Sequence, residues 1–331
     1  MKKAALLLLL ILISLSLPVF YSTPEKTIAV YMKGLEGEDV FLEAAKKDIS
    51  ANWVVITEDL TYDKIKDATV LIVIFVDQFA GITSDELSAI KKWFDDGGKV
   101  LWVAGDSDYG DDRNRQEPAN KVLEAVGSVL RIDLCSVEDK KSNAGKTYRV
   151  LGLSDKADPE VSFLVSGVTR ALFHGPGVIA AYKDGKWISL SEEKPANVYR
   201  VMWSSEGGII VNNNPPDPNA YSVGQEGRFV LMAIEIMPDK KNAVIATGDA
   251  PFDQYCGMYK PELKRPDRYG EKYPQQGAVL FKNIIDWAFK EHEGGVWEAA
   301  GPKYDMTLIL AVVVVVVIVV AAVVLLLKRK K

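Results

Sequence analysis

The run from Val70 to Asp108 reads VLIVIFVDQFAGITSDELSAIKKWFDDGGKVLWVAGDSD, and the rest of the chain is organised around it. It opens within a nearly continuous apolar segment, residues 68–76, which predicts a central strand covered on both faces. A second apolar segment, residues 99–104, ends at Gly105. The amphipathic residues between the two segments have helical spacing. The run therefore predicts a strand, a helix and a second strand, which is the repeating unit of a parallel sheet.

The helix of this unit carries its own start and stop signals. Thr83 opens the sequence T-S-D-E, which places Glu86 at the third helical position of a capping box. Asp95–Gly98 ends the helix because glycine adopts a left-handed backbone readily. The face that we expect to be buried consists of Leu87, Ile90, Trp93 and Phe94.

The flanking sequence continues the alternation of strands and helices. Strands are predicted at residues 27–32, 53–57 and 243–247, and helices at residues 39–49, 120–126 and 278–290. We therefore predict an α/β fold with a mostly parallel sheet flanked by helices. About 280 residues between the two chain ends are enough for one large core or two small ones.

The middle section, about residues 147–237, has a different pattern of short strands and turns. One hairpin is predicted at residues 179–190, with its turn at Asp184-Gly185. A second hairpin is predicted at residues 199–211, and a further strand at residues 229–236. The section predicts either antiparallel additions to the sheet or a β-rich insertion.

Both ends of the chain predict a membrane location. Residues 1–22 combine a basic start, an apolar run and small polar residues, which indicates a signal peptide or an uncleaved N-terminal anchor. Residues 306–327 are apolar throughout and about 33 Å long as a helix, which is enough to span a bilayer. The basic tail at residues 328–331 should stay cytoplasmic. We predict a single-pass type I protein with an extracellular domain at residues 24–292 and a juxtamembrane tether at residues 293–305.

The charge balance limits the partners that this domain is expected to bind. The chain has 40 Lys and Arg and 45 Asp and Glu, and six of the basic residues lie in the two terminal tails. The remaining 34 basic against 45 acidic residues give a net charge of −11, whereas nucleic acid requires a basic track. The lipid bilayer and other membrane or envelope proteins are the expected partners, with no nucleic acid. The economical loops favour an archaeal or bacterial cell envelope.

The chain has two cysteines, Cys135 and Cys256. Outside a membrane, a pair of cysteines is typical of a disulfide. We therefore predict a bridge between them. Two buried thiols, or one thiol that acts as a nucleophile, are the alternatives.

The run from Val70 to Asp108 resembles the class I glutamine-amidotransferase-like superfamily. It is most similar to the non-catalytic branch shared by gliding-motility proteins, ABC-transporter accessory proteins and intraflagellar-transport proteins. The pattern is an apolar strand, a T-x-x-E-L helix with a Trp and a closing Gly-Gly-Lys, and an apolar strand ending in Gly. The later segments AVIATGDAPFDQ and LFKNIIDWAF resemble the closing strand, Gly-Asp loop and helix of that branch. The resemblance implies an amidotransferase-like fold and a binding or assembly module, an accessory subunit of an ABC-type transporter or an envelope complex.

The enzymes of this superfamily carry a Cys nucleophile in the elbow after this strand, together with a His and an acid. The corresponding elbow here, Ala104–Asp108, contains no Cys, and the two histidines of the chain are His174 and His292. Ser107 with His174 as its base would be a substitute pair, but G-D-S-D-Y-G lacks the G-x-S-x-G spacing of a nucleophile elbow. We predict no catalytic residue and no enzymatic activity.

The acidic residues after this strand suggest a metal as an alternative. Carboxylates are the ligands that Ca²⁺ and Mg²⁺ prefer, and the candidate ligands are Asp106, Asp108, Asp111 and Asp112. The EF-hand spacing is broken because Gly110 is one position short. A solvated acidic turn without a cofactor is the simpler interpretation. A divergent metal-dependent hydrolase and an envelope structural protein are the alternative functions.

The pattern of a strand followed by Gly-Asp occurs twice, at Gly105-Asp106 and at Gly248-Asp249. If the two strands are neighbours, their acidic residues converge at the carboxyl edge of the sheet, where ligands bind in open α/β folds. The predicted ligand-binding residues are Asp106, Ser107, Asp108, Asp249 and Asp253. A cation, helix N-termini, or Arg113 or Arg115 must balance these carboxylates. Four tyrosines are candidates to frame the same edge: Tyr255, Tyr259, Tyr269 and Tyr273.

Overall fold

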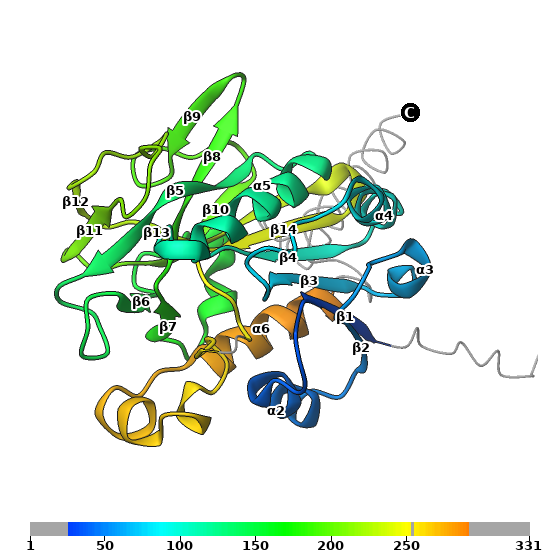
Figure 1. Cartoon of the computed structure of the whole chain (residues 1–331), viewed down its shortest axis with the longest axis horizontal. Helices are drawn as coiled ribbons and strands as arrows, with labels where there is room; N and C mark the ends of the chain where they lie inside the picture. The colour runs from blue at the N-terminus through cyan, green and yellow to red at the C-terminus, as the bar shows by residue number, and fades with distance from the viewer. Residues whose placement is uncertain (1–25, 253–254, 291–331) are drawn as a thin grey trace, which may run out of the picture.

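The structure is a computed structural model that describes residues 26–252 and 255–290 (Figure 1). Its main sheet has nine strands in the order β2-β1-β3-β4-β14-β13-β10-β6-β7. The first five are parallel: β2 (Asn52–Ile56), β1 (Thr27–Lys33), β3 (Val70–Phe75), β4 (Val100–Ala104) and β14 (Asn242–Thr247). The other four add antiparallel pairs: β13 (Val230–Met237), β10 (Val198–Trp203), β6 (Arg149–Leu153) and β7 (Arg170–His174).

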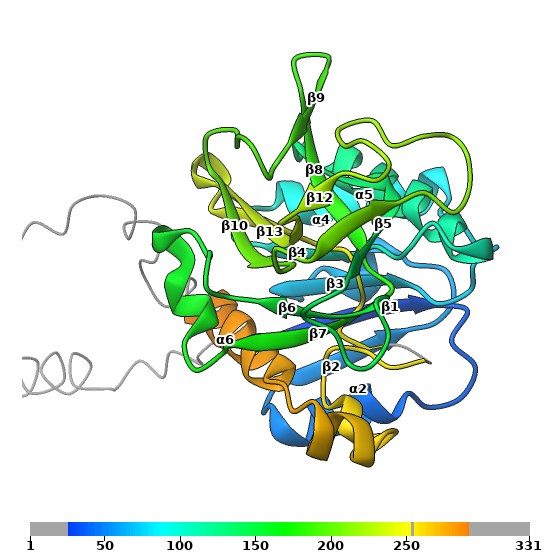
Figure 2. The same ribbon diagram turned by 90° about the vertical axis from the view of Figure 1, so that its left-hand side faces the viewer.

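A second, five-stranded sheet has the order β12-β11-β5-β8-β9. Its strands are β12 (Glu226–Gly227), β11 (Gly208–Val211), β5 (Leu130–Asp139), β8 (Gly177–Lys183) and β9 (Lys186–Ser189). The five α-helices of the described residues are α2 (Val40–Asp48), α3 (Tyr62–Ile65), α4 (Ser84–Asp95), α5 (Gln116–Ala125) and α6 (Gly277–Lys290). In Figure 2, α2 and α6 lie on one side of the main sheet, and α4, α5 and the second sheet lie on the other. The fold is therefore a layered mixed α/β structure.

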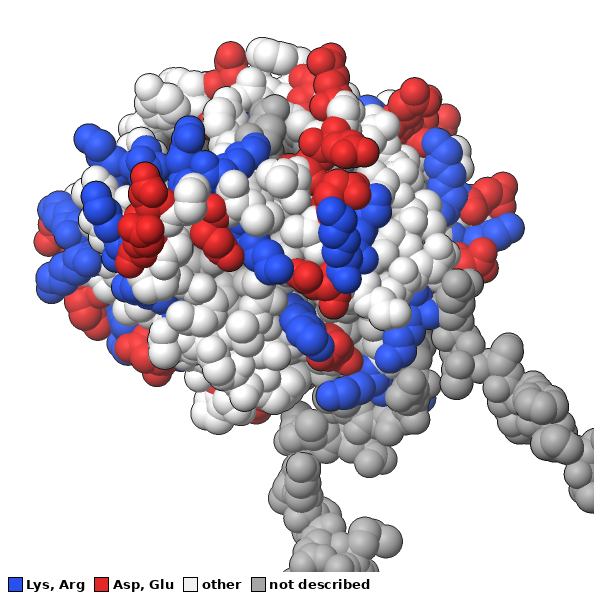
Figure 3. Space-filling view, turned by 90° about the horizontal axis from the view of Figure 1, so that it is seen from below, with Lys and Arg blue, Asp and Glu red and all other residues white. Residues whose placement is uncertain are grey.

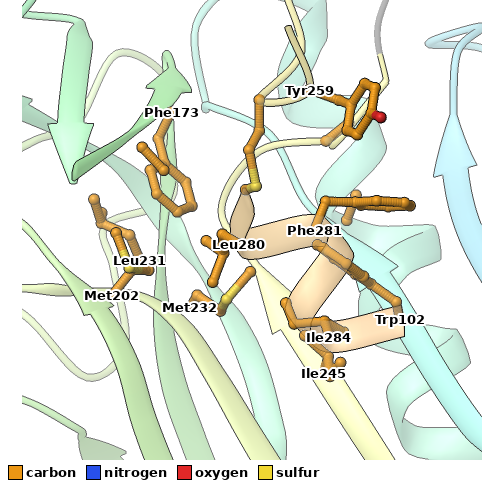
Figure 4. Packing of buried hydrophobic residues seen from close by; sticks show 14 of the residues in the cluster. Trp102, Phe173, Met202, Leu231, Met232, Ile245, Tyr259, Leu280, Phe281 and Ile284 are labelled. Carbon is orange, nitrogen blue, oxygen red and sulfur yellow. The ribbon is translucent and has the colours of Figure 1, made fainter. Parts of the chain in front are cut away.

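The central strands are buried on both faces, as their apolar runs predict. All six residues of β3 are buried, and α4 begins with the expected capping box of Thr83 and Glu86. On the opposite face, α6 packs against the sheet, and the ring centroids of Trp102 and Phe281 lie 5.4 Å apart. Figure 4 shows this cluster of aromatic, aliphatic and Met side chains between α6 and the strands. Burial of each large side chain contributes about 1.5–3 kcal/mol, so this packing fixes α6 on the sheet.

The middle section contains both of the arrangements that its sequence allows. The strands β6, β7, β10 and β13 extend the main sheet, whereas β8, β9, β11 and β12 join β5 in the second sheet. The predicted hairpin at residues 179–190 is confirmed as β8 and β9. The predicted hairpin at residues 199–211 is wrong, because β10 pairs with β13 while β11 pairs with β5. The turn residues between β10 and β11 predicted that these two strands pair with each other. Each strand instead pairs with a strand that is distant in the sequence.

The membrane location predicted from the chain ends is contradicted. Among residues 26–252 and 255–290, no helix is long and apolar enough to cross a membrane. The longest described helix, α6, has 14 residues and spans about 21 Å, less than a bilayer core of about 30 Å. The segments that carried the prediction, residues 1–22 and 293–331, lie outside the described residues. The single-pass type I topology is therefore withdrawn.

The predicted disulfide is also wrong. No disulfide joins Cys135 to Cys256, and both side chains are buried. Cys135 lies on β5 in the apolar core, and burial raises the pKa of its thiol well above the usual value, ahead of the influence of Asp133 and Asp108. The alternative of two buried thiols matches the structure. No covalent bond links these two positions, so the second sheet is held to the rest of the fold by packing.

Candidate functional site

The two Gly-Asp elbows lie side by side at the carboxyl edge of the main sheet. The strands β4 and β14 are parallel neighbours, with Ala104 opposite Thr247. The Gly105 N–H donates to the Thr247 carbonyl at 2.7 Å, which continues the pairing into the elbow. The two strands are therefore neighbours, which was the condition for their acidic residues to converge. Asp106 and Asp249 consequently line one cavity.

This cavity, which we call the elbow cavity, has a volume of about 460 Å³. Its lining comes from both sheets and from the loops after β4 and β14. The polar groups are Asp106, Ser107, Asp112, Ser136, Glu138, His174, Asn213 and Asp249, and the tyrosines are Tyr109, Tyr148 and Tyr255. Val137, Gly175 and Cys256 complete the wall. A volume of this size fits a small molecule.

Arg115 balances the acidic side chains of the first elbow. Its guanidinium donates to Asp106 Oδ2 at 2.7 Å and to Asp112 Oδ1 at 2.6 Å. The same group donates to the carbonyls of Phe75 at 2.7 Å and Val76 at 2.8 Å. The Arg115 side chain is only 5% exposed, so these bonds are shielded from water. One buried cation thus connects the ends of β3 and β4 and holds two carboxylates at the cavity.

The four aspartates predicted as a metal site do not gather around a common point. Asp108 accepts hydrogen bonds from Ser136 Oγ and, at 2.5 Å and 3.2 Å, from the N–H groups of Asn213 and Asn214. It therefore fixes the polar loop that follows β11, while Asp111 is exposed. Within residues 26–252 and 255–290, no group of three or more His, Cys, Asp or Glu side chains is arranged to hold a metal ion. Asp106, Asp108 and Asp112 act as hydrogen-bond acceptors within the fold.

Asp249 is held by backbone donors at the second elbow. Its Oδ2 accepts the N–H of His174 at 2.6 Å, and its Oδ1 accepts the N–H of Ala250 at 2.8 Å. The carboxylate thereby joins the end of β14 to the end of β7. Asp253, the other residue predicted here, lies outside the described residues, as does His292.

Ser107 and His174 line the same cavity but do not form a nucleophile–base pair. Ser107 Oγ accepts the N–H of Tyr109 at 3.1 Å, and it lies 3.5 Å from Asp112 Oδ2. In the described part of the chain, no hydrogen bond joins Ser107 to the His174 imidazole, whose ring packs edge-on against Tyr148 at 5.6 Å.

The surroundings of the His174 imidazole favour its neutral form. Burial lowers its pKa below the usual 6.5, and the positive charges of Arg149 and Arg268 lower it further, against the opposing effect of Asp112. A neutral imidazole can both donate and accept a hydrogen bond. Beside its carboxylates, the cavity therefore contains a group that can donate or accept a hydrogen bond.

Three tyrosine rings border the cavity with substantial exposure. Tyr109 is 69% exposed, Tyr255 is 60% exposed and Tyr148 is 38% exposed. Of the four tyrosines predicted to frame this edge, Tyr255 lines the cavity, whereas Tyr259 and Tyr269 are buried in the core. Tyr273 is partly buried against the core cluster.

Sequence reasoning missed the wall that β5 and the middle section supply. Ser136, Glu138 and Tyr148 come from β5 and from the residue before β6. Asn213 comes from the polar loop after β11. None of these residues lies in a recognisable motif, since only the packing of the second sheet beside β4 and β14 brings them to the cavity.

The chain is similar to several solved structures, although no protein-family model matches it and no curated protein matches it in sequence. The structure described as "mmIFT52 N-terminal domain" has a TM-score of 0.51 and 13% identity, covering 80% of this chain and 97% of that one. At this identity, the likeness shows a shared fold alone.

Two further solved structures are amidotransferase-like. They are a putative GMP synthase component from Thermoplasma acidophilum and a glutamine amidotransferase from Thermotoga maritima. The first has a TM-score of 0.37 and 10% identity, covering 81% of this chain and 96% of that one. The second has a TM-score of 0.33 and 10% identity, covering 83% and 99%. These scores are too low to carry an argument about this chain.

Proposed function

We propose that the protein is a non-catalytic binding module whose ligand occupies the elbow cavity. The supporting observation is that the polar side chains of the first elbow already make hydrogen bonds within the protein. Asp106 and Asp112 share Arg115, and Ser107 Oγ accepts a backbone N–H. A nucleophilic Ser–His site would instead couple the hydroxyl to an imidazole. The Ser107 hydroxyl has only a long contact, 3.5 Å, with Asp112, whose carboxylate is already paired with Arg115. The elbow therefore has the features of a rigid binding wall.

The lining favours a ligand that is uncharged or positively charged. Asp112, Glu138 and Asp249 present carboxylates to the cavity, which repel an anion and accept hydrogen bonds. The exposed tyrosine rings offer flat faces that pack against apolar groups or attract cations. A small molecule rich in hydrogen-bond donors satisfies both features.

Saturation-transfer NMR on the full chain tests this proposal with three probes, namely spermidine, glucose and citrate. We expect transfer to spermidine or glucose but not to citrate. Tyr109→Ala and Tyr255→Ala should weaken that transfer. The matched control is Tyr182→Ala, since Tyr182 is 39% exposed on β8 and does not line the cavity. Transfer to citrate alone, or equal transfer in all variants, would contradict the proposal.

A hydrolysis assay separates binding from catalysis. With p-nitrophenyl acetate and with glutamine as substrates, we expect Ser107→Ala to have the same rate as the unmodified chain. A nucleophilic Ser107 would instead cause a loss of about 100-fold or more, with unchanged thermal stability. That result would replace the binding module with a hydrolase.

We further propose, on the sequence resemblance, that the module is an accessory subunit of an ABC-type transporter or an envelope complex. Isolation of the full chain from its own host in mild detergent tests this assignment. Stoichiometric co-purification with transporter subunits is the expected result. A lone monomer under the same conditions would count against the accessory role while leaving ligand binding in the elbow cavity unaffected.

A further inference from the structure

A second hollow, of about 520 Å³, shares no lining residue with the elbow cavity. It lies at the end of β10, where Trp203 pairs with Leu153 of β6 and with Val230 of β13. We call it the β10 hollow. The side chains that matter for its chemistry are Lys156, Asp158, Arg200, Trp203, Glu206 and Arg228.

The charge of the β10 hollow differs from that of the chain as a whole. The whole chain carries a net charge of −5. Figure 3 shows how Lys and Arg intermingle with Asp and Glu over one face of the molecule. At the hollow, four cations meet three carboxylates: Lys156, Lys194, Arg200 and Arg228 against Asp155, Asp158 and Glu206.

Of these carboxylates, Asp158 is fully engaged within the protein. It accepts hydrogen bonds from Arg200 Nη2 at 2.8 Å, from Lys194 at 3.0 Å and from the Arg200 N–H at 2.8 Å. Arg200 in turn lies over the Trp203 ring at 5.1 Å. The charges of Arg200 and Asp158 therefore cancel. The remaining cations, Lys156, Lys194 and Arg228, determine which charge the hollow attracts.

Two buried N–H donors at the hollow lack an acceptor. Arg228 Nη2 donates to both oxygens of Asp155, at 2.9 Å and 2.8 Å, and this side chain is 9% exposed. In the described residues, Arg228 Nε and Trp203 Nε1 have no hydrogen-bond partner. Trp203 is only 5% exposed. A buried donor without an acceptor costs free energy that a bound acceptor would recover.

Glu206 lies beside one of these donors, Arg228 Nε, and beside Lys156 Nζ without satisfying either group. Its Oε1 lies 3.6 Å from Arg228 Nε and 3.7 Å from Lys156 Nζ, and both distances exceed that of a hydrogen bond. The Glu206 side chain is 64% exposed and lies on the turn between β10 and β11. An exposed side chain with such contacts rotates outward at little cost. Its departure would uncover Arg228 Nε and leave four cations against two carboxylates.

We propose that the β10 hollow is an oxyanion site, which takes a carboxylate or phosphate group in the place that the Glu206 carboxylate now covers. Arg228 Nε and Lys156 Nζ supply charge-assisted hydrogen bonds, and Trp203 Nε1 supplies a neutral one. An oxyanion has several acceptor oxygens, so a single group can accept from donors on three different segments. Arg200, held by Asp158, packs over the Trp203 ring, which lines the hollow.

Indole N–H spectra of the full chain labelled with ¹⁵N-tryptophan test the site directly. The chain has seven tryptophans, and Trp203→Phe identifies the signal of Trp203. Inorganic phosphate and acetate are added separately, at constant ionic strength adjusted with sodium chloride. We expect a saturable downfield shift of the Trp203 signal, with the other indole signals unchanged. The comparison of the two anions shows whether the site prefers phosphate or carboxylate.

Two variants distinguish a built site from general ion binding. Arg228→Gln should weaken binding by about tenfold or more, whereas Glu206→Gln should tighten it by about threefold because the competing carboxylate is gone. Arg113→Gln is the control, since Arg113 is exposed and donates to Pro215. Glu206 is on an exposed turn, so its variant is expected to fold even if Arg228→Gln does not. The proposal is overturned if neither anion moves the Trp203 signal, or if Glu206→Gln fails to tighten binding.

Discussion

The elbows after β4 and β14 have the same sequence pattern and lie next to each other, yet their carboxylates are stabilised in different ways. Asp106 faces the buried guanidinium of Arg115, at 2.7 Å. Asp249 accepts two backbone N–H groups, from His174 and Ala250. Both carboxylates accept the N–H of the next residue, from Ser107 at 2.6 Å and from Ala250 at 2.8 Å. The difference lies in the further partner, which is a guanidinium for Asp106 and a second backbone N–H for Asp249. An acidic residue after a strand is therefore weak evidence for a metal, because the fold itself can supply the counter-charge.

The glycines of the two elbows also differ in what surrounds them. A Cβ atom on Gly248 would lie 2.0 Å from the Gly177 carbonyl oxygen, which belongs to the backbone of β8. A Cβ atom on Gly105 would lie 2.6 Å from Cδ1 of Ile132, a side-chain atom. At the second elbow, two backbone segments, those of Gly248 and Gly177, therefore lie in close contact. The first depends more on its buried charge pair.

Replacement of Arg115 should have the largest effect on the first elbow. Arg115→Met leaves Asp106 without its cation and removes donors from the carbonyls of Phe75 and Val76. We expect a loss of about 3–5 kcal/mol in the free energy of unfolding. Arg113→Met is the control and should change stability by about 0.5 kcal/mol or less. Urea unfolding of the full chain measures both, and equal losses would show that Asp106 is stabilised by something else.

The next largest effect is expected from the glycine of the second elbow. Gly248→Ala forces the β14 elbow away from β8, because backbone atoms cannot rotate aside. We expect a loss of about 3 kcal/mol, against about 1 kcal/mol for Gly105→Ala, where the Ile132 side chain can shift. Thermal unfolding of the two variants provides the comparison. A reversed order would mean that Ile132 is more rigidly held than the Gly177 backbone.

The sequence predicts the parallel half of the fold well because its signals are local. The all-buried strand β3, the capping box of Thr83 and Glu86, and the apolar face of α4 depend on neighbouring residues. The repeated Gly-Asp pattern raised the question of whether β4 and β14 are neighbours, and the structure shows that they are. These elements define the sheet edge where the elbow cavity forms.

The antiparallel half and most of the cavity wall depend on long-range pairing. The strand β11 pairs with Ser136–Asp139 of β5, which no turn signal near residues 199–211 could indicate. Arg115 could be named as a balancing charge, but its bonds to Phe75 and Val76 connect residues about 40 positions apart. The membrane and disulfide predictions were wrong for a related reason. They relied on composition, whereas the described structure holds no suitable helix and keeps the two cysteines unbridged.

The smallest expected effect is a pH dependence of stability that arises from His174 at the second elbow. His174 donates its backbone N–H to Asp249, while burial and then Arg149 and Arg268 lower the pKa of its imidazole below the usual 6.5. The unfolded chain therefore binds a proton at His174 more readily than the folded chain does. Stability is present above about pH 6.5 and is lost as the pH falls below it.

His174→Gln isolates this contribution, because it keeps the backbone N–H that Asp249 accepts and removes the titrating ring. We expect the unmodified chain to lose more stability than His174→Gln between about pH 7.5 and about pH 5.5. Urea midpoints at the two pH values, at equal ionic strength, measure the difference. Equal losses would show that the imidazole accepts a proton in the folded chain as easily as in the unfolded one. The elbow at β14 would then tolerate a charge beside its backbone-held carboxylate, as the elbow at β4 does through Arg115.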